Sequence, residues 1–332
     1  QSAGSPRRHP PPASGPLPAA PRRWGKTSLV RKVGEDIGTT SLRIINLDVF
    51  ACRNPEEFYM LYATELIKQT ASRWEEWVEN AKRFLSGLVP KISLGIDPVT
   101  DFTLSFDFSY PRLNEDVLNL PQKIAEEKGI RIVVCLDEFQ QVAEFDESVY
   151  FQRKLRSVWQ LHQNVTYCLY GSKPHLMTKL FSKQKMPFYK FGDVVYLQKI
   201  STPDWVEFIC RRFEVTGKQI SPDLAEKVCT TVENHSSYVQ QLAWLLWVQT
   251  DKEATETGFQ KAYSDLLNQN SILYFKYVDG LTTYQLNFLG AIADGLTSEF
   301  TRKENLAYYQ LGTSANIGRL KKSLENKELV DI

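Results

Sequence analysis

The chain has 332 residues, of which 42% are hydrophobic and 24% are charged, so it is long enough for two globular domains. Its formal net charge of +1 excludes a global attraction to nucleic acid or to an anionic membrane, and any basic surface must be local. The sequence holds no apolar run of membrane-spanning length and no signal-peptide pattern, and we expect no membrane contact.

The five cysteines are scattered along the chain and never form a C-x-x-C pair. Cys135 and Cys168 lie within apolar runs of strand length, where a thiol behaves as a small hydrophobic side chain. This usage favours a reduced, cytoplasmic location without a zinc site.

The first 21 residues contain seven of the 16 prolines, beside Gly, Ala, Ser and Arg. This composition predicts a disordered or aberrant N-terminus over residues 1–19. Two origins stay open: a natural flexible tail, or a fragment boundary with a misread or fused start. Neither provides a buried strand immediately before residue 20.

Apolar runs of strand length alternate with helical spacing through the first 198 residues. Strands are predicted at 42–50, 130–140, 165–172 and 194–198, and helices at 25–37, at 55–85 as one or two helices, at 115–128 and at 150–162. A β-hairpin insert is predicted at about 91–110. The alternation predicts an α/β fold with a parallel sheet covered by helices on both faces, and after Lys199 the pattern is almost wholly helical.

The stretch "GKTS" at 25–28 is the end of a phosphate-binding loop of the form G-x-x-x-x-G-K-[ST], with Ala20 in place of the first glycine. In such a loop, backbone N–H groups and the following helix N-terminus surround phosphates. Lys26 would reach the β- and γ-phosphates, and the Thr27 hydroxyl would bind Mg²⁺. The alternative is a helix N-terminus that simply carries a basic residue.

The run "IVVCLDE" ends in Asp137 and Glu138, about 110 residues after the loop. A buried strand delivers the carboxylates at its end to the crevice where open α/β sheets bind ligands. Asp137 would hold Mg²⁺, and Glu138 would orient and polarise the attacking water. The next predicted strand ends in Ser172, which would sense the γ-phosphate or align the water, unless Gly171 and Ser172 form only a turn.

These motifs resemble the AAA+-like P-loop ATPases of the STAND class, especially the family described as predominantly archaeal ATPases. The resemblance covers about 20–332 and rests on "PRRWGKTSL", "VVCLDEFQ", "CLYGSK" and "ENHSSYVQQLAWLLW". The tail from "LTTYQLNFLGAIADG" onward is similar to the winged helix of such proteins. The resemblance implies an ATPase core at 20–198, a helical lid at 199–272 and a winged-helix domain at 273–332, which we expect to be truncated.

The resemblance also implies ATP and Mg²⁺ as ligands. It assigns the phosphate loop to Pro21, Arg22, Arg23, Trp24, Gly25, Lys26, Thr27 and Ser28. His235 would be a nucleotide sensor in the lid, although Ser236 stands where the family usually has proline. The alternative to a sensor is a histidine at a helix start whose hydrogen bonds are satisfied locally.

In this class, hydrolysis needs a positive charge against the γ-phosphate, often from a neighbouring subunit. Available candidates are Arg153, Arg156, Arg211 and Arg212, and a solvated helix residue is the alternative for each. A second copy of the chain or another protein partner is therefore expected to supply this arginine.

The C-terminal stretch 313–328 places Ile317, Leu320 and Leu324 on one helix face and Arg319, Lys321 and Lys322 elsewhere. In a DNA-binding winged helix, the basic residues would contact phosphates and Asn316 would contact bases. Because Glu325, Glu328 and Asp331 lie close by, we favour an interaction or regulatory module over a DNA-binding one.

The sequence thus predicts a Mg²⁺-dependent ATPase that acts as a nucleotide-controlled switch. Hydrolysis is expected to be slow, and impaired by the missing first strand. The alternatives are an ATP-regulated DNA-binding protein and a nucleotide-binding scaffold without significant hydrolysis.

Overall fold

The computed structural model describes residues 17–19, 24–71, 73–85, 90–93, 102–109, 112–327 and 329–330. The described chain divides into two compact units. Unit 1 comprises the described residues up to Thr202 together with Val232–Tyr238, and unit 2 comprises Pro203–Thr231 and the described residues from Val239 onward.

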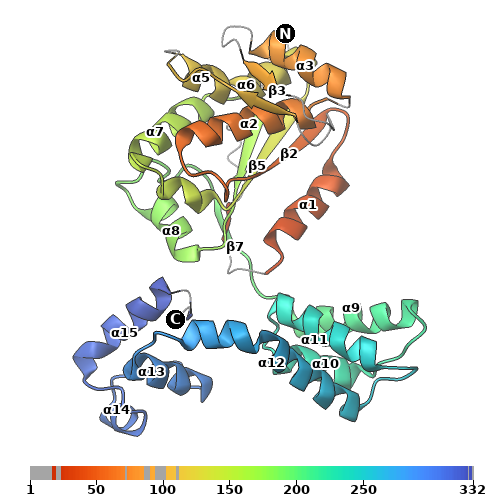
Figure 1. The fold of residues 1–332 in the computed structure, drawn as a ribbon, viewed down its shortest axis with the longest axis vertical. Helices are drawn as coiled ribbons and strands as arrows, with labels where there is room; N and C mark the ends of the chain where they lie inside the picture. Colours follow the sequence, from red (N-terminus) through yellow and green to blue (C-terminus); the bar gives the residue numbers. More distant parts are fainter. Residues whose placement is uncertain are drawn as a thin grey trace, which may run out of the picture. The chain divides into compact units, whose positions relative to one another are not determined.

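Unit 1 is built on parallel strands (Figure 1). Three strands pair in the order β2-β5-β6, and the register places Asp48 opposite Asp137 at the carboxyl ends. A second ladder joins β1 to β7, and β1 also contacts β6. The strands are β1 (Leu17–Ala19), β2 (Leu42–Asp48), β5 (Arg131–Asp137), β6 (Val165–Leu169) and β7 (Val194–Tyr196).

The expectation that no strand precedes the phosphate loop is wrong. Leu17–Ala19 form β1, which pairs in parallel with β7 and ends just before residue 20. A three-residue strand needs few ladder hydrogen bonds, and a proline is tolerated where its missing N–H would point away from the ladder. Residues 1–16 lie outside the described residues, so disorder there stays a prediction.

Helices lie on both sides of the β2-β5-β6 sheet, as the alternation of strands and helices predicts. Figure 1 shows α1 (Lys26–Ile37) on one side and α7 (Ser148–Trp159) and α8 (Pro174–Ser182) on the other. The α7 side contains the aromatic core, where Phe58 of α2 (Pro55–Gln69) packs edge-on against Phe151 at 5.2 Å. Trp159 stacks on Tyr167 of β6 at 4.2 Å between ring centroids.

The apolar stripe of α1 is poorly buried. The predicted helix is present, but Leu29, Val33 and Ile37 are 47%, 44% and 50% exposed. The sheet face toward α1 is also less covered than the opposite face. Val133 and Cys168 are half-buried, whereas the residues that follow them, Val134 and Leu169, are buried. Periodicity therefore identified the helix correctly without showing how much of its stripe is covered.

Two predicted helical regions of unit 1 are each divided in two. The region that begins at Pro55 contains α2 and α3 (Trp74–Phe84), and the side chain of Asn54 caps α2 by accepting a 2.9 Å hydrogen bond from the Glu57 N–H. The single helix predicted at 115–128 is α5 (Leu113–Leu118) followed by α6 (Leu120–Lys128). The break lies at Asn119 because Pro121 lacks the N–H that would continue α5.

The predicted hairpin insert is confirmed in its described residues. β3 (Lys91–Ser93) and β4 (Thr103–Ser105) pair in antiparallel fashion, and the residues that connect them lie outside the described part. Leu104 is buried, and its N–H donates to the hydroxyl of Thr64 on α2 at 3.1 Å. The hairpin is thus fixed to unit 1 by both apolar and polar contacts.

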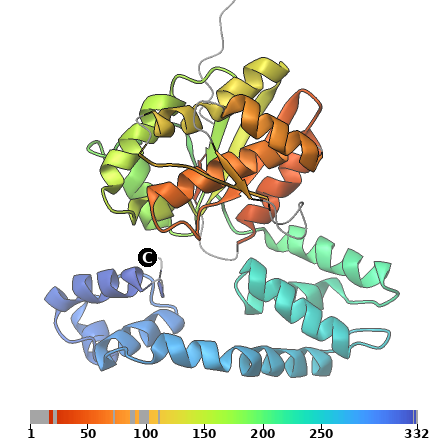
Figure 2. The ribbon, with the colours of Figure 1, turned by 45° about the horizontal axis from the view of Figure 1, so that its top comes forward.

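Unit 2 is helical, as predicted for the chain after Lys199. Figures 1 and 2 show α12 as a long helix that joins the bundle of α9, α10 and α11 to the last three helices. The helices are α9 (Thr202–Val215), α10 (Pro222–Thr231), α11 (Ser236–Gln249), α12 (Glu256–Val278), α13 (Thr283–Ala293), α14 (Lys303–Tyr308) and α15 (Ser314–Asn326). None of the helices that the structure describes is long and apolar enough to cross a membrane.

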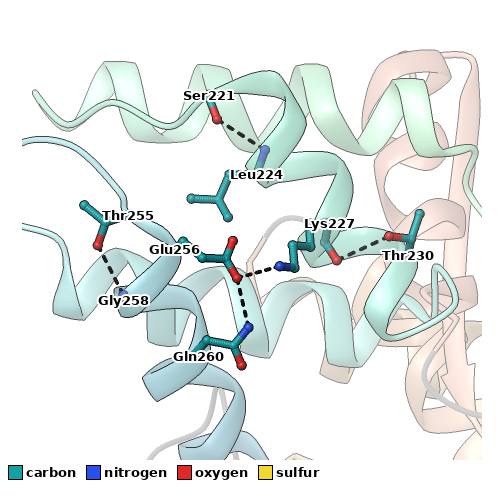
Figure 3. A network of polar contacts seen from close by, with 8 residues as sticks. All are labelled: Ser221, Leu224, Lys227, Thr230, Thr255, Glu256, Gly258 and Gln260. Carbon is teal, nitrogen blue, oxygen red and sulfur yellow. Dashed lines mark hydrogen bonds and ion pairs between the residues drawn. The ribbon is translucent and has the colours of Figure 1, made fainter.

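Polar contacts join the start of α12 to α10 (Figure 3). Glu256 accepts hydrogen bonds from Lys227 at 2.5 Å and from Gln260 at 2.9 Å. The Thr255 hydroxyl caps α12 by accepting from the Gly258 N–H at 3.2 Å. The last three helices have a separate core, in which Phe288 stacks on Phe300 at 4.6 Å.

Candidate nucleotide site

The end of β5 and the start of α1 meet at one polar point. The Thr27 hydroxyl donates a short hydrogen bond to Oδ2 of Asp137, although the two residues are 110 positions apart. Lys26, the preceding residue, is only 5% exposed. The structure therefore brings together three of the residues that the sequence assigns to phosphate and metal binding.

Gly25 directs the chain into α1. It precedes the helix with φ at 88°, in the left-handed region that favours glycine, and its carbonyl accepts the Leu29 N–H at 2.8 Å. Trp24 is half-buried and Ser28 is exposed, while Pro21, Arg22 and Arg23 lie outside the described residues. The roles of these loop residues stay predictions.

Asp137 is a buried carboxylate whose loss of hydration is partly offset by hydrogen bonds. It is 8% exposed, and its Oδ1 accepts the Glu138 N–H at 2.9 Å. Burial raises the pKa of Asp137, and the nearby charges of Glu138 and Asp48 add to the rise, while the hydrogen bonds from Thr27 and the Glu138 N–H oppose it. A hydroxyl beside a buried carboxylate is a donor set that suits Mg²⁺, which prefers oxygen ligands.

Glu138 is held in a fixed position beyond the end of β5. Its backbone is left-handed, with φ at 52°, and its Oε2 accepts a 2.7 Å hydrogen bond from the Ser172 hydroxyl and another from the Gln140 amide. Among the described residues, no hydrogen bond ends on Oε1. The carboxylate is therefore oriented through one oxygen, and the other is available as an acceptor.

Gln140 and Gly171 are site residues that the sequence interpretation missed. Gln140 is buried, and a Cβ at Gly171 would lie 1.8 Å from its Oε1. Gly171 therefore leaves the space in which Gln140 reaches Glu138. The only signals in the sequence were the positions of these residues beside Glu138 and Ser172, in "DEFQ" and "YGS".

His235 belongs to the segment 232–238 of unit 1, as Asn234 does. Asn234 donates to the Thr202 hydroxyl at 2.9 Å, and the His235 ring lies tilted against Tyr238 at 4.8 Å. Neither contact involves Asp137 or Glu138. The sensor role of His235 stays a prediction.

The candidate arginines differ in their surroundings. Arg156 is half-buried and donates to the backbone carbonyls of Tyr189, at 2.9 Å, and Pro187, so it fixes the segment before β7. Arg153, Arg211 and Arg212 are exposed. The first belongs to unit 1 and the other two to unit 2.

The parallel sheet with helices on both faces and the helical second unit are the α/β fold of AAA+-like P-loop NTPases. Among solved structures, a Walker-type ATPase of Pyrococcus abyssi is similar with a TM-score of 0.65 and 18% identity, over 95% of this chain and 84% of the other. The ORC2 protein of Aeropyrum pernix, in its ADPNP–ADP complexes, is similar with a TM-score of 0.57 and 15% identity, over 96% and 81% of the two chains. No protein-family model and no curated protein matches the sequence.

Proposed function

We propose that this protein binds ATP together with Mg²⁺ and hydrolyses it slowly, as a nucleotide-controlled switch of the STAND type. The observation that carries the proposal is the hydrogen bond between Thr27 and Asp137, because it joins a phosphate-loop hydroxyl to a carboxylate at the end of a neighbouring strand. The similarity to a solved structure with bound ADPNP and ADP supports the same ligand class.

Each residue has a distinct role in this proposal. Lys26 would contact the β- and γ-phosphates, and Thr27 and Asp137 would hold Mg²⁺, which supplies charge neutralisation at the phosphates. Oε1 of Glu138 would accept a proton from the attacking water, while Ser172 and Gln140 fix the other oxygen. An arginine from a second copy or another protein would complete the charge stabilisation, which is why slow hydrolysis is expected from the isolated chain.

The catalytic part is tested with Glu138→Gln, which keeps the shape of the side chain and removes its basicity. We expect ATP binding to be retained and turnover to fall by about 100-fold or more. Glu304→Gln is the control, because Glu304 is exposed and belongs to unit 2. Equal turnover in wild type and Glu138→Gln would contradict the role of Glu138.

A second candidate function is ATP-regulated DNA binding through α15. Its apolar residues Ile317, Leu320 and Leu324 are buried in the last core, and among the described residues neither Arg319 nor Lys322 forms an ion pair. Arg319 and Lys322 are exposed, so α15 carries positive charge on its outer face, although Glu325 follows Lys322 by three residues. The cations would contact phosphates if α15 enters a major groove.

This candidate predicts duplex binding that weakens steeply with salt, and a smaller salt slope when Arg319, Lys321 and Lys322 are changed to Gln. The control changes the exposed Lys252, Lys261 and Lys276 to Gln, which removes the same charge elsewhere in unit 2. Equal losses of duplex affinity in the two triple variants, or no duplex binding at low salt, would contradict a DNA contact through α15.

A further inference from the structure

Unit 2 contains a cavity of about 430 Å³ between α9 and α11, far along the chain from the phosphate loop. Aromatic rings dominate its lining, and none of the described residues that line it carries a carboxylate. The rings come from Trp205, Phe208, Phe213, Trp244 and Trp247. The volume lies in the range of pockets that bind small molecules.

Trp247 in the aromatic lining is held in place by Thr216, which also lines the cavity, and by Lys218, which does not. The Trp247 indole N–H donates to the Thr216 hydroxyl at 2.8 Å, and the Lys218 ammonium lies 4.2 Å from the centre of the Trp247 ring. The same ammonium donates to the Trp247 carbonyl at 2.7 Å. Trp205 packs edge-on against Phe208 at 5.8 Å. These contacts order Trp247 and Trp205 before any ligand arrives, which lowers the entropic cost of binding, while Trp244 and Phe208 are 55% and 50% exposed.

The rim of the cavity carries a cation that the described chain does not neutralise. Arg212 lines the cavity, and among the described residues its guanidinium has no hydrogen-bond or ion-pair partner. Trp205 is 5% exposed, and its indole N–H has no acceptor among the described residues. The exposed guanidinium of Arg212 thus offers the lining a positive charge without a matching carboxylate among the described residues.

The chemistry of the lining selects among ligands. Flat apolar surfaces favour an aromatic ring system, because rings stack on indole and phenyl faces. Arg212 and Lys218 together disfavour a cationic ligand, although bare aromatic cages often bind such ligands. A carboxylate, in contrast, pairs with a guanidinium through two parallel hydrogen bonds.

We propose that the cavity between α9 and α11 binds a small aromatic carboxylic acid, with its rings among the tryptophans and its carboxylate on Arg212. This site is separate from the proposed nucleotide site, and it goes beyond the proposed ATPase function. Because Lys26 lies in unit 1, Lys26→Ala should leave acid binding unchanged.

Two naphthalene probes of opposite charge test the proposal by calorimetry on the full chain. We expect 1-naphthaleneacetate to bind with a dissociation constant on the order of 0.1 mM, and 1-naphthylmethylamine to bind about tenfold more weakly or not at all. Quenching of the tryptophan fluorescence should accompany acid binding, since three tryptophans line the cavity.

Matched variants locate the binding. Arg212→Gln should weaken acid binding by about tenfold and remove the preference for the acid over the amine. The neighbouring exposed Arg211, which does not line the cavity, provides the control Arg211→Gln, which should bind as wild type does. Trp244→Ala should weaken the binding of both probes. The circular dichroism spectrum of this variant shows whether the helices are retained.

Three results with the two probes would overturn the proposal. The first is equal affinity of wild type for both probes, which means apolar adsorption only. The others are equal losses of acid affinity in Arg211→Gln and Arg212→Gln, and no acid binding at millimolar concentration. A peptide ligand that binds the cavity while naphthaleneacetate does not would also overturn it, because the site would then serve a protein partner.

Discussion

Gly171 shows how a single residue without a side chain controls the candidate site. A methyl group there would lie 1.8 Å from Oε1 of Gln140 and 3.1 Å from the sulfur of Met177. Gln140 is 3% exposed, so it has little space into which to move. Its hydrogen bond to Glu138 would be lost.

Gly171→Ala is therefore expected to reduce ATP turnover by about tenfold while ATP binding is retained, because only the orientation of Glu138 is disturbed. Gln140→Ala should have a similar effect, and the double variant should lose no more than the single ones, since both act through the same hydrogen bond. Steady-state turnover and nucleotide binding of the three variants measure this. Additive losses would show that Gly171 acts by another route.

The raised pKa of Asp137 gives the metal site a pH dependence. A carboxyl with a raised pKa takes up a proton at a higher pH than an ordinary aspartate, and the protonated form binds Mg²⁺ poorly. We expect the Mg²⁺ concentration that is needed for ATP binding to rise on acidification. The rise should begin at a pH above the ordinary pKa of an aspartate, which is about 4.

Thr27→Ala removes a proposed Mg²⁺ ligand and should lower the Mg²⁺ affinity at every pH. It should also move the acid-dependent loss of affinity to still higher pH, because the Thr27 hydrogen bond opposes the rise in the pKa of Asp137. Magnesium titrations at fixed ATP, repeated between pH 7 and 4, measure the shift. A Mg²⁺ affinity that is flat over that range in both proteins would contradict a buried Asp137 as metal ligand.

At the scale of elements, His162 links three parts of unit 1. The ring is 4% exposed and lies after α7; its Nδ1 is 2.8 Å from the Tyr167 hydroxyl of β6, and its Nε2 is 3.1 Å from Oδ1 of Asn119, between α5 and α6. A neutral ring satisfies both contacts, by accepting at Nδ1 and donating at Nε2. Burial lowers the pKa of His162 to about 4.

This shift makes unit 1 less stable in acid. In the unfolded chain, His162 takes up a proton near its ordinary pKa of about 6.5. The folded protein keeps the ring neutral down to about pH 4. Between these two pH values, protonation therefore favours the unfolded state. Between pH 7 and 5 the free energy of unfolding should fall by about 2 kcal/mol from this group. His162→Gln should flatten that part of the pH dependence in urea denaturation, and equal slopes in both proteins would contradict the assignment.

The elements also show where sequence patterns succeed and fail. Long apolar runs predicted β2, β5 and β6, and the spacing after Gly25 predicted α1, because these signals are local. β1 was missed because its three residues lie in a proline-rich context and are ordered by pairing with β7, which is distant in sequence. The sequence contains Pro121, but the division of α5 from α6 depends on the backbone hydrogen bond that this proline cannot donate. The periodicity of apolar residues does not reveal that missing bond.

At the scale of the whole molecule, the motifs predicted the class of fold and the meeting of Thr27 with Asp137, because strand order in such folds brings these segments to one sheet edge. Gln140, Gly171 and the cavity between α9 and α11 were not predictable, since each depends on side-chain packing between elements. The position of Arg212 was visible in the sequence, but its place beside five aromatic rings was not.

The proposed nucleotide site is tested most directly by the affinity of the full chain for ATP with Mg²⁺, compared between Lys26→Ala and Lys32→Ala. Both changes remove a lysine from α1, but Lys32 is exposed and paired with Asp36 at 2.8 Å, whereas Lys26 is buried beside Thr27. We predict that Lys26→Ala weakens ATP binding by about 10- to 100-fold and that Lys32→Ala binds as wild type does. ATP binding that is the same in wild type and Lys26→Ala would contradict a nucleotide site at the start of α1.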